Sequence, residues 1–133
     1  MQVRIPSVSD EPFQIADQIA YLLVEFSGEF SVEACKSCID QMVSACESLN
    51  RSRVLLDCRR IQGLLPTFDR FQVAVYGSSK RQQIERIALV RDSGARPVDN
   101  FVEDVAVNRG LNLKAFTDFE PADTWLREPR TES

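Results

Sequence analysis

Four cysteines are the residues of this chain best suited to redox or metal chemistry. Cys35 and Cys38 form a Cys-x-x-Cys motif, which in redox proteins lies where a strand meets a helix N-terminus and the thiol pKa is lowered. Here Cys35 lies about one turn inside a predicted helix, on an apolar stripe that repeats at helical spacing. This placement favours cysteines that act as small buried hydrophobic residues. A thiol-dependent redox protein that uses Cys35 and Cys38 remains an alternative.

Histidine chemistry and metal ligation find little support in the residue types. The chain has no histidine, which excludes Ser-His-Asp and Cys-His catalysis, histidine metal ligands and a histidine pH switch. Zinc sites use closely spaced ligand pairs, and Cys46 and Cys58 do not supply a second pair. We therefore predict neither a metal site nor a cofactor.

Asp57 follows a short apolar run, residues 54–56, with the continuous hydrophobic pattern of a strand buried on both faces. Ligands of open α/β sheets meet the loops after such strands. Asp57 could therefore act as a general base or bind a cation. The alternative is that it accepts hydrogen bonds from neighbouring backbone or pairs with Arg59 or Arg91. No second carboxylate stands at a spacing that specifies acid–base work.

The segment after this strand combines Gly and Pro with two leucines. Leu64 and Leu65 either fold under the loop as a lid on the core or form an apolar contact surface. Thr67 stands where a helix begins, so its hydroxyl is expected to cap that helix, with phosphorylation as the alternative. The carboxyl ends of parallel strands lie on one rim, which brings residues from two loops together. The predicted recognition surface consists of Asp57, Leu64, Leu65, Thr67, Arg70 and Arg91.

The elements that position these residues alternate between strand and helix patterns. Strands are predicted over residues 3–8, 19–26, 53–58, 86–90 and 113–117. Helices are predicted over residues 31–49, from 67 to about 77, from about 97 to 110, and in a short segment that contains Trp125 and Leu126. Phe68, Phe71 and Val75 share one face of the second helix, and Trp125 is expected to pack its ring against the sheet.

This order predicts an α/β fold with a mixed, mostly parallel sheet and about four helices. Turn residues at positions 10–12 indicate that the first two strands form an antiparallel amino-terminal hairpin. The length of the chain corresponds to a single domain, which we place at residues 1–128, with a flexible tail at 129–133.

Charge and hydropathy narrow the function classes further. Residues 51–96 carry ten basic and four acidic side chains within a chain of net charge −4. We interpret this basic stretch as part of a mixed solvated surface and predict no nucleic-acid binding. No segment approaches the roughly 20 apolar residues of a membrane span, and the amino terminus has no apolar run of signal-peptide length. We therefore expect no membrane span and a cytoplasmic location.

Three segments taken in order resemble the bacterial STAS-like family, which shares the fold of the sporulation anti-sigma-factor antagonists. Residues 28–33 resemble the entry to its first helix, residues 54–59 its central strand with a terminal aspartate, and residues 107–126 its closing helix–strand–helix. The resemblance covers most of the chain and implies a binding module. It also relates the chain to CRAL-TRIO-type lipid-binding domains, which carry apolar ligands.

The resemblance includes one clear departure. Antagonists of the sporulation type are switched by phosphorylation in an Asp-Ser-Ser-Gly segment at the start of the second helix. Aligned without gaps from Asp57, that segment falls on Leu65-Pro66-Thr67-Phe68, where only Thr67 keeps a hydroxyl group. Thr67 is therefore the one residue to which the phosphoacceptor role can be transferred.

We predict a non-enzymatic regulatory module that recognises a protein partner through the loop between the central strand and the second helix. The first alternative is a carrier of a small apolar or anionic ligand, and the second is the redox protein described above. Homodimer formation is left open.

Overall fold

The computed structural model describes residues 3–5, 12–29, 31–62, 65–92 and 101–129 of the chain. Three strands come first, followed by three helix–strand units and a last helix. In chain order the elements are β1 (Val3–Ile5), β2 (Phe13–Asp17), β3 (Leu22–Glu29), α1 (Val32–Leu49), β4 (Arg53–Gln62), α2 (Thr67–Ser78), β5 (Arg86–Val90), α3 (Phe101–Asn108), β6 (Leu113–Phe116) and α4 (Phe119–Arg127).

The strands form one mixed sheet whose spatial order equals the chain order, β1 to β6. β1, β2 and β3 pair antiparallel, whereas β3, β4, β5 and β6 pair parallel. The predicted fold class, an α/β domain with a mostly parallel sheet and an antiparallel amino-terminal hairpin, is confirmed. The described residues also contain the four helices expected.

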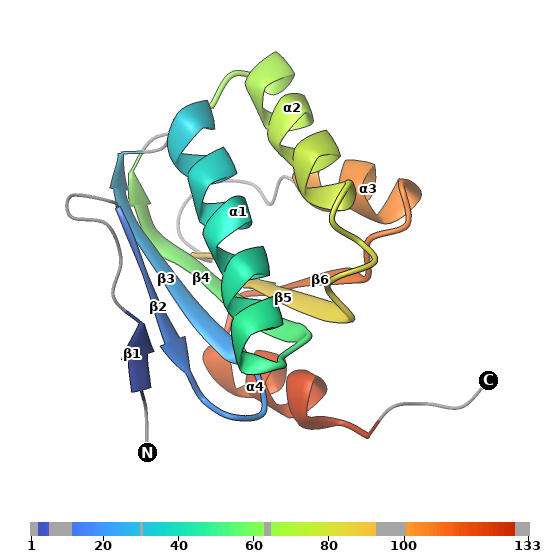
Figure 1. The fold of residues 1–133 in the computed structure, drawn as a ribbon. Coiled ribbons are helices and arrows are strands. Elements are labelled where there is room, and N and C mark those ends of the chain that lie inside the picture. The colour runs from blue at the N-terminus through green and yellow to red at the C-terminus, as the bar shows by residue number, and fades with distance from the viewer. Residues whose placement is uncertain (1–2, 6–11, 30, 63–64, 93–100, 130–133) are drawn as a thin grey trace.

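The helices lie on both faces of the sheet (Figure 1): α1, α2 and α3 on one face and α4 on the other. Each parallel step from β3 to β6 moves to the next strand in the same direction, and such crossovers are almost always right-handed. Consequently α1, α2 and α3 cover the same face. The last helix, α4, follows β6 and packs on the opposite face.

Two hydrophobic clusters follow from this arrangement. The larger lies between the sheet and α1–α3, and its buried side chains include Leu22, Val24 and Val54. The smaller lies under α4 and includes Leu55, Ala88 and Leu126. Neighbouring residues Val54 and Leu55 belong to different clusters because successive side chains of a strand point to opposite faces. The continuous apolar run of the central strand therefore reflects burial on both sides.

β2 has no counterpart among the predicted strands, and it corrects the predicted hairpin. β1 pairs with β2, and β2 in turn pairs with β3, so the segments predicted as partners are not neighbours. The predicted strand over 19–26 begins only at Leu22, because Ile19 lies in a turn with φ 73° and donates its backbone N–H to Asp17 Oδ1 at 2.9 Å. Ile19 itself is 66% exposed.

The ends of the first two long helices differ in how well they were predicted. Ser31 caps α1 as expected, with its hydroxyl oxygen accepting a hydrogen bond from the backbone N–H of Ala34 at 3.1 Å. Thr67 does not cap α2: it is the first helical residue, and Pro66 occupies the capping position without a side-chain hydrogen bond. Proline has no side-chain oxygen that could accept a hydrogen bond from the N–H groups of the first turn, so no side chain of the capping residue closes this end of α2.

The remaining predicted elements agree closely with the structure. β5 has the predicted bounds, and β6 ends one residue before the predicted end. β4 continues to Gln62, four residues beyond the predicted end of the central strand. The predicted start of the third helix near residue 97, the last part of the first predicted strand, and residues 130–133 of the predicted tail lie outside the described residues.

Candidate functional site

The centre of the predicted site is an irregularity in β4. Glu25 and Ser27 of β3 pair with Asp57 and Arg60 of β4, so β4 accommodates one more residue than β3 at this point. Such a bulge bends its strand and redirects side chains, and bulges are frequent next to functional sites. Arg59 lies within this bulge and reaches back to Asp57, two residues earlier in the strand.

Asp57 is a buried, fully engaged carboxylate. Arg59 donates from Nε to Oδ1 and from a terminal nitrogen to Oδ2, both at 2.9 Å, and its backbone N–H donates to Oδ1 at 3.1 Å. Burial raises the pKa of Asp57, but the hydrogen bonds and charge of Arg59 outweigh this effect and leave the pKa below its usual value. Of the two interpretations offered by the sequence, the structure therefore favours a structural ion pair over a general base.

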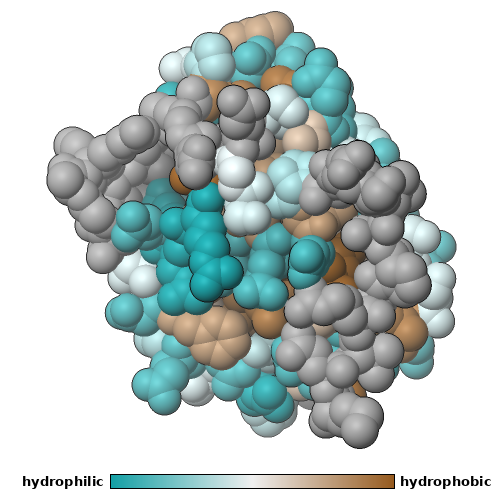
Figure 2. Space-filling model, turned by 90° about the vertical axis from the view of Figure 1, so that its left-hand side faces the viewer, coloured by the Kyte–Doolittle hydropathy of each residue, from teal (hydrophilic) through white to brown (hydrophobic). Residues whose placement is uncertain are grey.

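A small polar hollow opens beside this ion pair. It has a volume of about 150 Å³ and is lined by residues of β2, β3 and β4, among them Glu25, Asp57 and Arg60. On the side of the molecule that carries β1, hydrophilic side chains gather into a continuous area (Figure 2). Small-molecule sites usually occupy roughly 300–1,000 Å³ and are mainly apolar, so this hollow is not a typical carrier cavity.

The connection between β4 and α2 brings together part of the predicted surface. Leu65 is 7% exposed and belongs to the larger core cluster, which supports the lid interpretation for this leucine. Leu64 lies outside the described residues. Thr67 is exposed, and its hydroxyl oxygen accepts a hydrogen bond from a terminal nitrogen of Arg70 at 3.3 Å. Thr67 and Arg70 thus form one polar contact on the first turn of α2.

Arg91 belongs to a different part of the rim. Asp57 of β4 pairs with Val90 of β5, so Arg91 follows directly beyond that level while β4 runs on to Gln62. Gln62 pairs with Glu29 of β3, so the end of β4 lies three strand levels beyond Arg91, or roughly 10 Å at about 3.3 Å per residue. Arg91 instead lines a hollow of about 280 Å³ together with Phe116, Thr117, Asp118 and other residues at the end of β6 and the start of α4.

Two phenylalanines of α2 were not predicted as surface residues. Phe68 is 68% exposed and Phe71 is 37% exposed, and the helix is buried through Ala74 and Ser78 instead. Positions three apart lie on the same side of a helix, so the shared face of Phe68 and Phe71 expected from their spacing is turned largely to solvent. The sequence holds a weak indication of this: apolar residues occur on more than one side of the helix.

The thiols have the environment of core residues. Cys35, Cys38 and Cys46 are buried, Cys58 is half-buried, and all four are free. Burial raises the pKa of Cys35 to about 12 and, with a contribution from Glu47, that of Cys46 to about 11. Burial, reinforced by Cys38, Cys35 and Asp57, also raises the pKa of Cys58. Thiols with raised pKa values remain protonated at neutral pH, which disfavours the redox alternative.

We expect a thiol reagent to label the native protein slowly at all four positions, because three thiols are buried and the pKa of Cys58 is raised well above its usual value. The labelling rate of Cys35 should stay low until the pH approaches its pKa of about 12 or the protein unfolds. Mass spectrometry after timed alkylation, in buffer and in denaturant, measures both effects. Rapid native labelling of Cys35 together with Cys38 would contradict the core interpretation.

Two further properties concern the part of the chain that the structure describes. There, no three His, Cys, Asp or Glu side chains come close enough together to hold a metal ion. Nor does any helix in that part combine the length and apolar character needed to cross a membrane.

Comparisons with known proteins place this arrangement in context. The family model described as SpoIIAA-like matches residues 21–127, well over half of the chain. The matched region begins at Tyr21, just before β3, and ends with α4, so β1 and β2 precede it. No curated protein matches the chain.

Proposed function

We propose that this chain, which belongs to the SpoIIAA-like family, is a non-enzymatic regulatory module that binds a protein partner at the connection between β4 and α2. Membership of the family confirms the predicted STAS-like resemblance, and such a domain fits a protein-binding role in general terms. The specific surface is our proposal: Thr67, Phe68 and Arg70 contact the partner, while Leu65 holds the connection from below.

The exposure of Phe68 is the observation that carries this proposal. Its ring is 68% exposed on the first turn of α2, directly after the connection. Completing the burial of a phenylalanine side chain contributes about 1.5–3 kcal/mol, and aromatic anchors of this kind dominate many interfaces. A partner that covers Phe68 would gain this free energy, and the adjacent hydroxyl and guanidinium groups would supply orientation.

Thr67 gives the surface a means of control. Its exposed hydroxyl already contacts Arg70, and it stands at the N-terminus of α2, where helix N–H groups lack partners within the helix and favour negative charge. Phosphorylation would add about −1.5 to −2 charge units beside Phe68. In this proposal the modified surface loses or changes its partner.

The other predicted site residues have supporting roles in this proposal. Asp57 holds Arg59 and the bulge of β4 in place rather than contacting the partner. Arg91 lies on the separate hollow beside the start of α4 and is not required for recognition. The carrier alternative is less well supported, because both described hollows are smaller than usual ligand sites.

The Phe68→Ser substitution is expected to reduce capture of the natural protein partner about tenfold or more, because it removes the aromatic anchor. The measurement is affinity capture from a native lysate, with quantitative mass spectrometry of the retained proteins. Ile19→Ser is the matched control: Ile19 is 66% exposed, similar to Phe68, but lies on the turn between β2 and β3.

Both variants must first show the unfolding curve of the unmodified protein. Equal capture by Phe68→Ser and the unmodified protein would place recognition elsewhere. Equal loss with Ile19→Ser would mean that general surface hydrophobicity, and not the start of α2, retains the captured proteins.

A further inference from the structure

Basic side chains gather near the carboxyl ends of α2 and α3. Lys80 and Arg81 follow α2, and Arg109 follows α3 directly. Within the described residues none of the three forms an ion pair with a carboxylate. Lys80 and Arg109 lie instead over aromatic rings, 5.2 Å from the Tyr76 centroid and 5.7 Å from the Phe71 centroid respectively.

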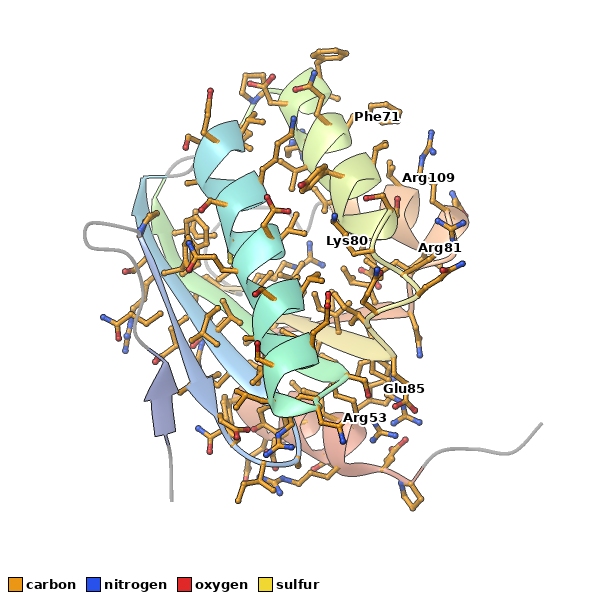
Figure 3. The ribbon with its side chains drawn as sticks, in the orientation of Figure 1. Arg53, Phe71, Lys80, Arg81, Glu85 and Arg109 are labelled. Carbon is orange, nitrogen blue, oxygen red and sulfur yellow. The ribbon has the colours of Figure 1, made fainter. Side chains whose placement is uncertain are left out.

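Apolar side chains lie next to these charges. Phe71 of α2 is 37% exposed and Val107 of α3 is 46% exposed, although the two helices pack against one another. Phe71, Arg81 and Arg109 lie on the side of α2 that carries α3 (Figure 3), whereas Lys80 lies over Tyr76, whose hydroxyl donates to Asp40 of α1. We call Phe71, Arg81, Val107 and Arg109 the basic α2–α3 surface.

Helix dipoles explain only part of this arrangement. Basic residues near a helix C-terminus are favourable there, and Arg81 indeed donates a hydrogen bond to the backbone oxygen of Ser78 at 3.3 Å. Arg109 does not serve its own helix in this way, since its guanidinium extends to a ring on α2. The exposure of Phe71 and Val107 has no relation to the dipoles.

Charge is also sorted along these two helices. The acidic residues Asp69, Glu103 and Asp104 lie in the first turns of α2 and α3, away from the basic ends. Arg81 and Arg109 create a positive field at this end of the pair, and no carboxylate of the described residues forms an ion pair with either of them. Such a field speeds the approach of an acidic surface and disfavours a basic one.

We propose that the basic α2–α3 surface binds an acidic segment of the protein partner that also carries large apolar side chains. Carboxylates of that segment pair with Arg109 and Arg81, and its apolar side chains cover Phe71 and Val107. The inference rests on the proposed function, because Phe71 lies three residues after Phe68 on the same side of α2. It adds the chemical character of the partner.

The test uses two fluorescein-labelled helical peptides with identical apolar faces of Phe and Leu. One carries Glu at every polar position and the other carries Lys. Fluorescence anisotropy with the full chain should show binding of the Glu peptide, weakening as salt rises, and no comparable binding of the Lys peptide. The Arg109→Glu substitution should weaken the affinity of the chain for the Glu peptide about tenfold.

Lys114→Glu is the matched control for charge. Lys114 is exposed on β6, its ammonium group lies over Phe116 and Trp125 beside α4, and its reversal changes the net charge equally. It should leave the affinity for the Glu peptide unchanged. In a charge exchange, the Arg81→Glu, Arg109→Glu double variant should bind the Lys peptide better than the unmodified protein does.

Equal binding of both peptides, or equal effects of Arg109→Glu and Lys114→Glu, would overturn the inference. Vesicles of phosphatidylserine and phosphatidylcholine that bind in an Arg109-dependent way, without peptide binding, would assign the surface to a membrane. Arg109-dependent self-association in sedimentation would assign it to a second copy of the chain. Each of these two results would also overturn the inference. If the peptide test fails while Phe68→Ser still loses its partner, only the proposed acidic character of the partner's segment is refuted. If Phe68→Ser keeps its partner, the proposed function falls.

Discussion

The Phe13→Ala substitution is expected to lower the free energy of unfolding by about 3–5 kcal/mol, the range for truncating a large aromatic side chain in a core. Phe13 is 1% exposed, and its ring stacks on that of Phe26 with centroids 5.9 Å apart. The two residues are also register partners between β2 and β3. The measurement is two-state chemical denaturation followed by fluorescence or circular dichroism.

Phe68→Ala is the matched control for this prediction, because it removes the same side chain from an exposed position. Its effect should stay within about 0.5 kcal/mol, as for most surface substitutions. Similar losses for the two variants would contradict the burial difference. The result has wider meaning, because β2 precedes the region matched by the family model and yet contributes to the central core.

The Leu126→Ala substitution is expected to cost about 2–5 kcal/mol, because Leu126 is fully buried in the cluster between α4 and the sheet. The helix is held there by polar contacts as well. Arg53 donates to the backbone oxygen of Leu126 at 2.7 Å, and Arg86 donates to that of Trp125 at 2.6 Å. The last carbonyls of a helix lack the usual intrahelical donors, and that of Trp125 also accepts a hydrogen bond from the backbone N–H of Glu128 at 3.3 Å.

Trp125→Ala is the comparison that tests where the free energy lies. Trp125 is only half-buried. The centroid of its ring lies 5.9 Å from the centroid of the Phe116 ring, and the Arg86 guanidinium lies 5.3 Å from the centroid of the Trp125 ring. The expectation that Trp125 packs against the sheet is therefore met in part, and we expect its truncation to cost less than that of Leu126. Urea denaturation of both variants decides the order, and a larger loss for Trp125→Ala would contradict it.

The two stability predictions are independent of the recognition proposals. Phe13 and Leu126 lie in different clusters on opposite faces of the sheet. Phe68, by contrast, is largely outside both. Substitutions in the clusters should reduce the amount of folded protein without changing which partner the folded fraction binds. Substitutions at Phe68 or Arg109 should change binding at constant stability.

The fold class and most elements follow from the sequence alone, because they depend on local patterns. The apolar stripe of α1 with Ser31 as its cap, and the continuous apolar runs of β4 and β5, reflect the 3.6- and 2-residue periods of helix and strand. Right-handed crossovers then leave few topologies open. The absence of histidine and the burial of Cys35 could also be predicted from the sequence, because residue types and their spacing determine them.

Tertiary structure decided what depends on contacts between distant segments. β2 is short and is stabilised by pairing with β1 and β3, so its own sequence pattern is weak. The stagger between Arg91 and the end of β4 arises because β4 extends beyond β5. Phe68 is exposed because α2 packs through small residues, Ala74 and Ser78, which allow close approach to its neighbours. Apolar side chains predict burial in general, but the direction in which a helix turns its faces is set by what it packs against.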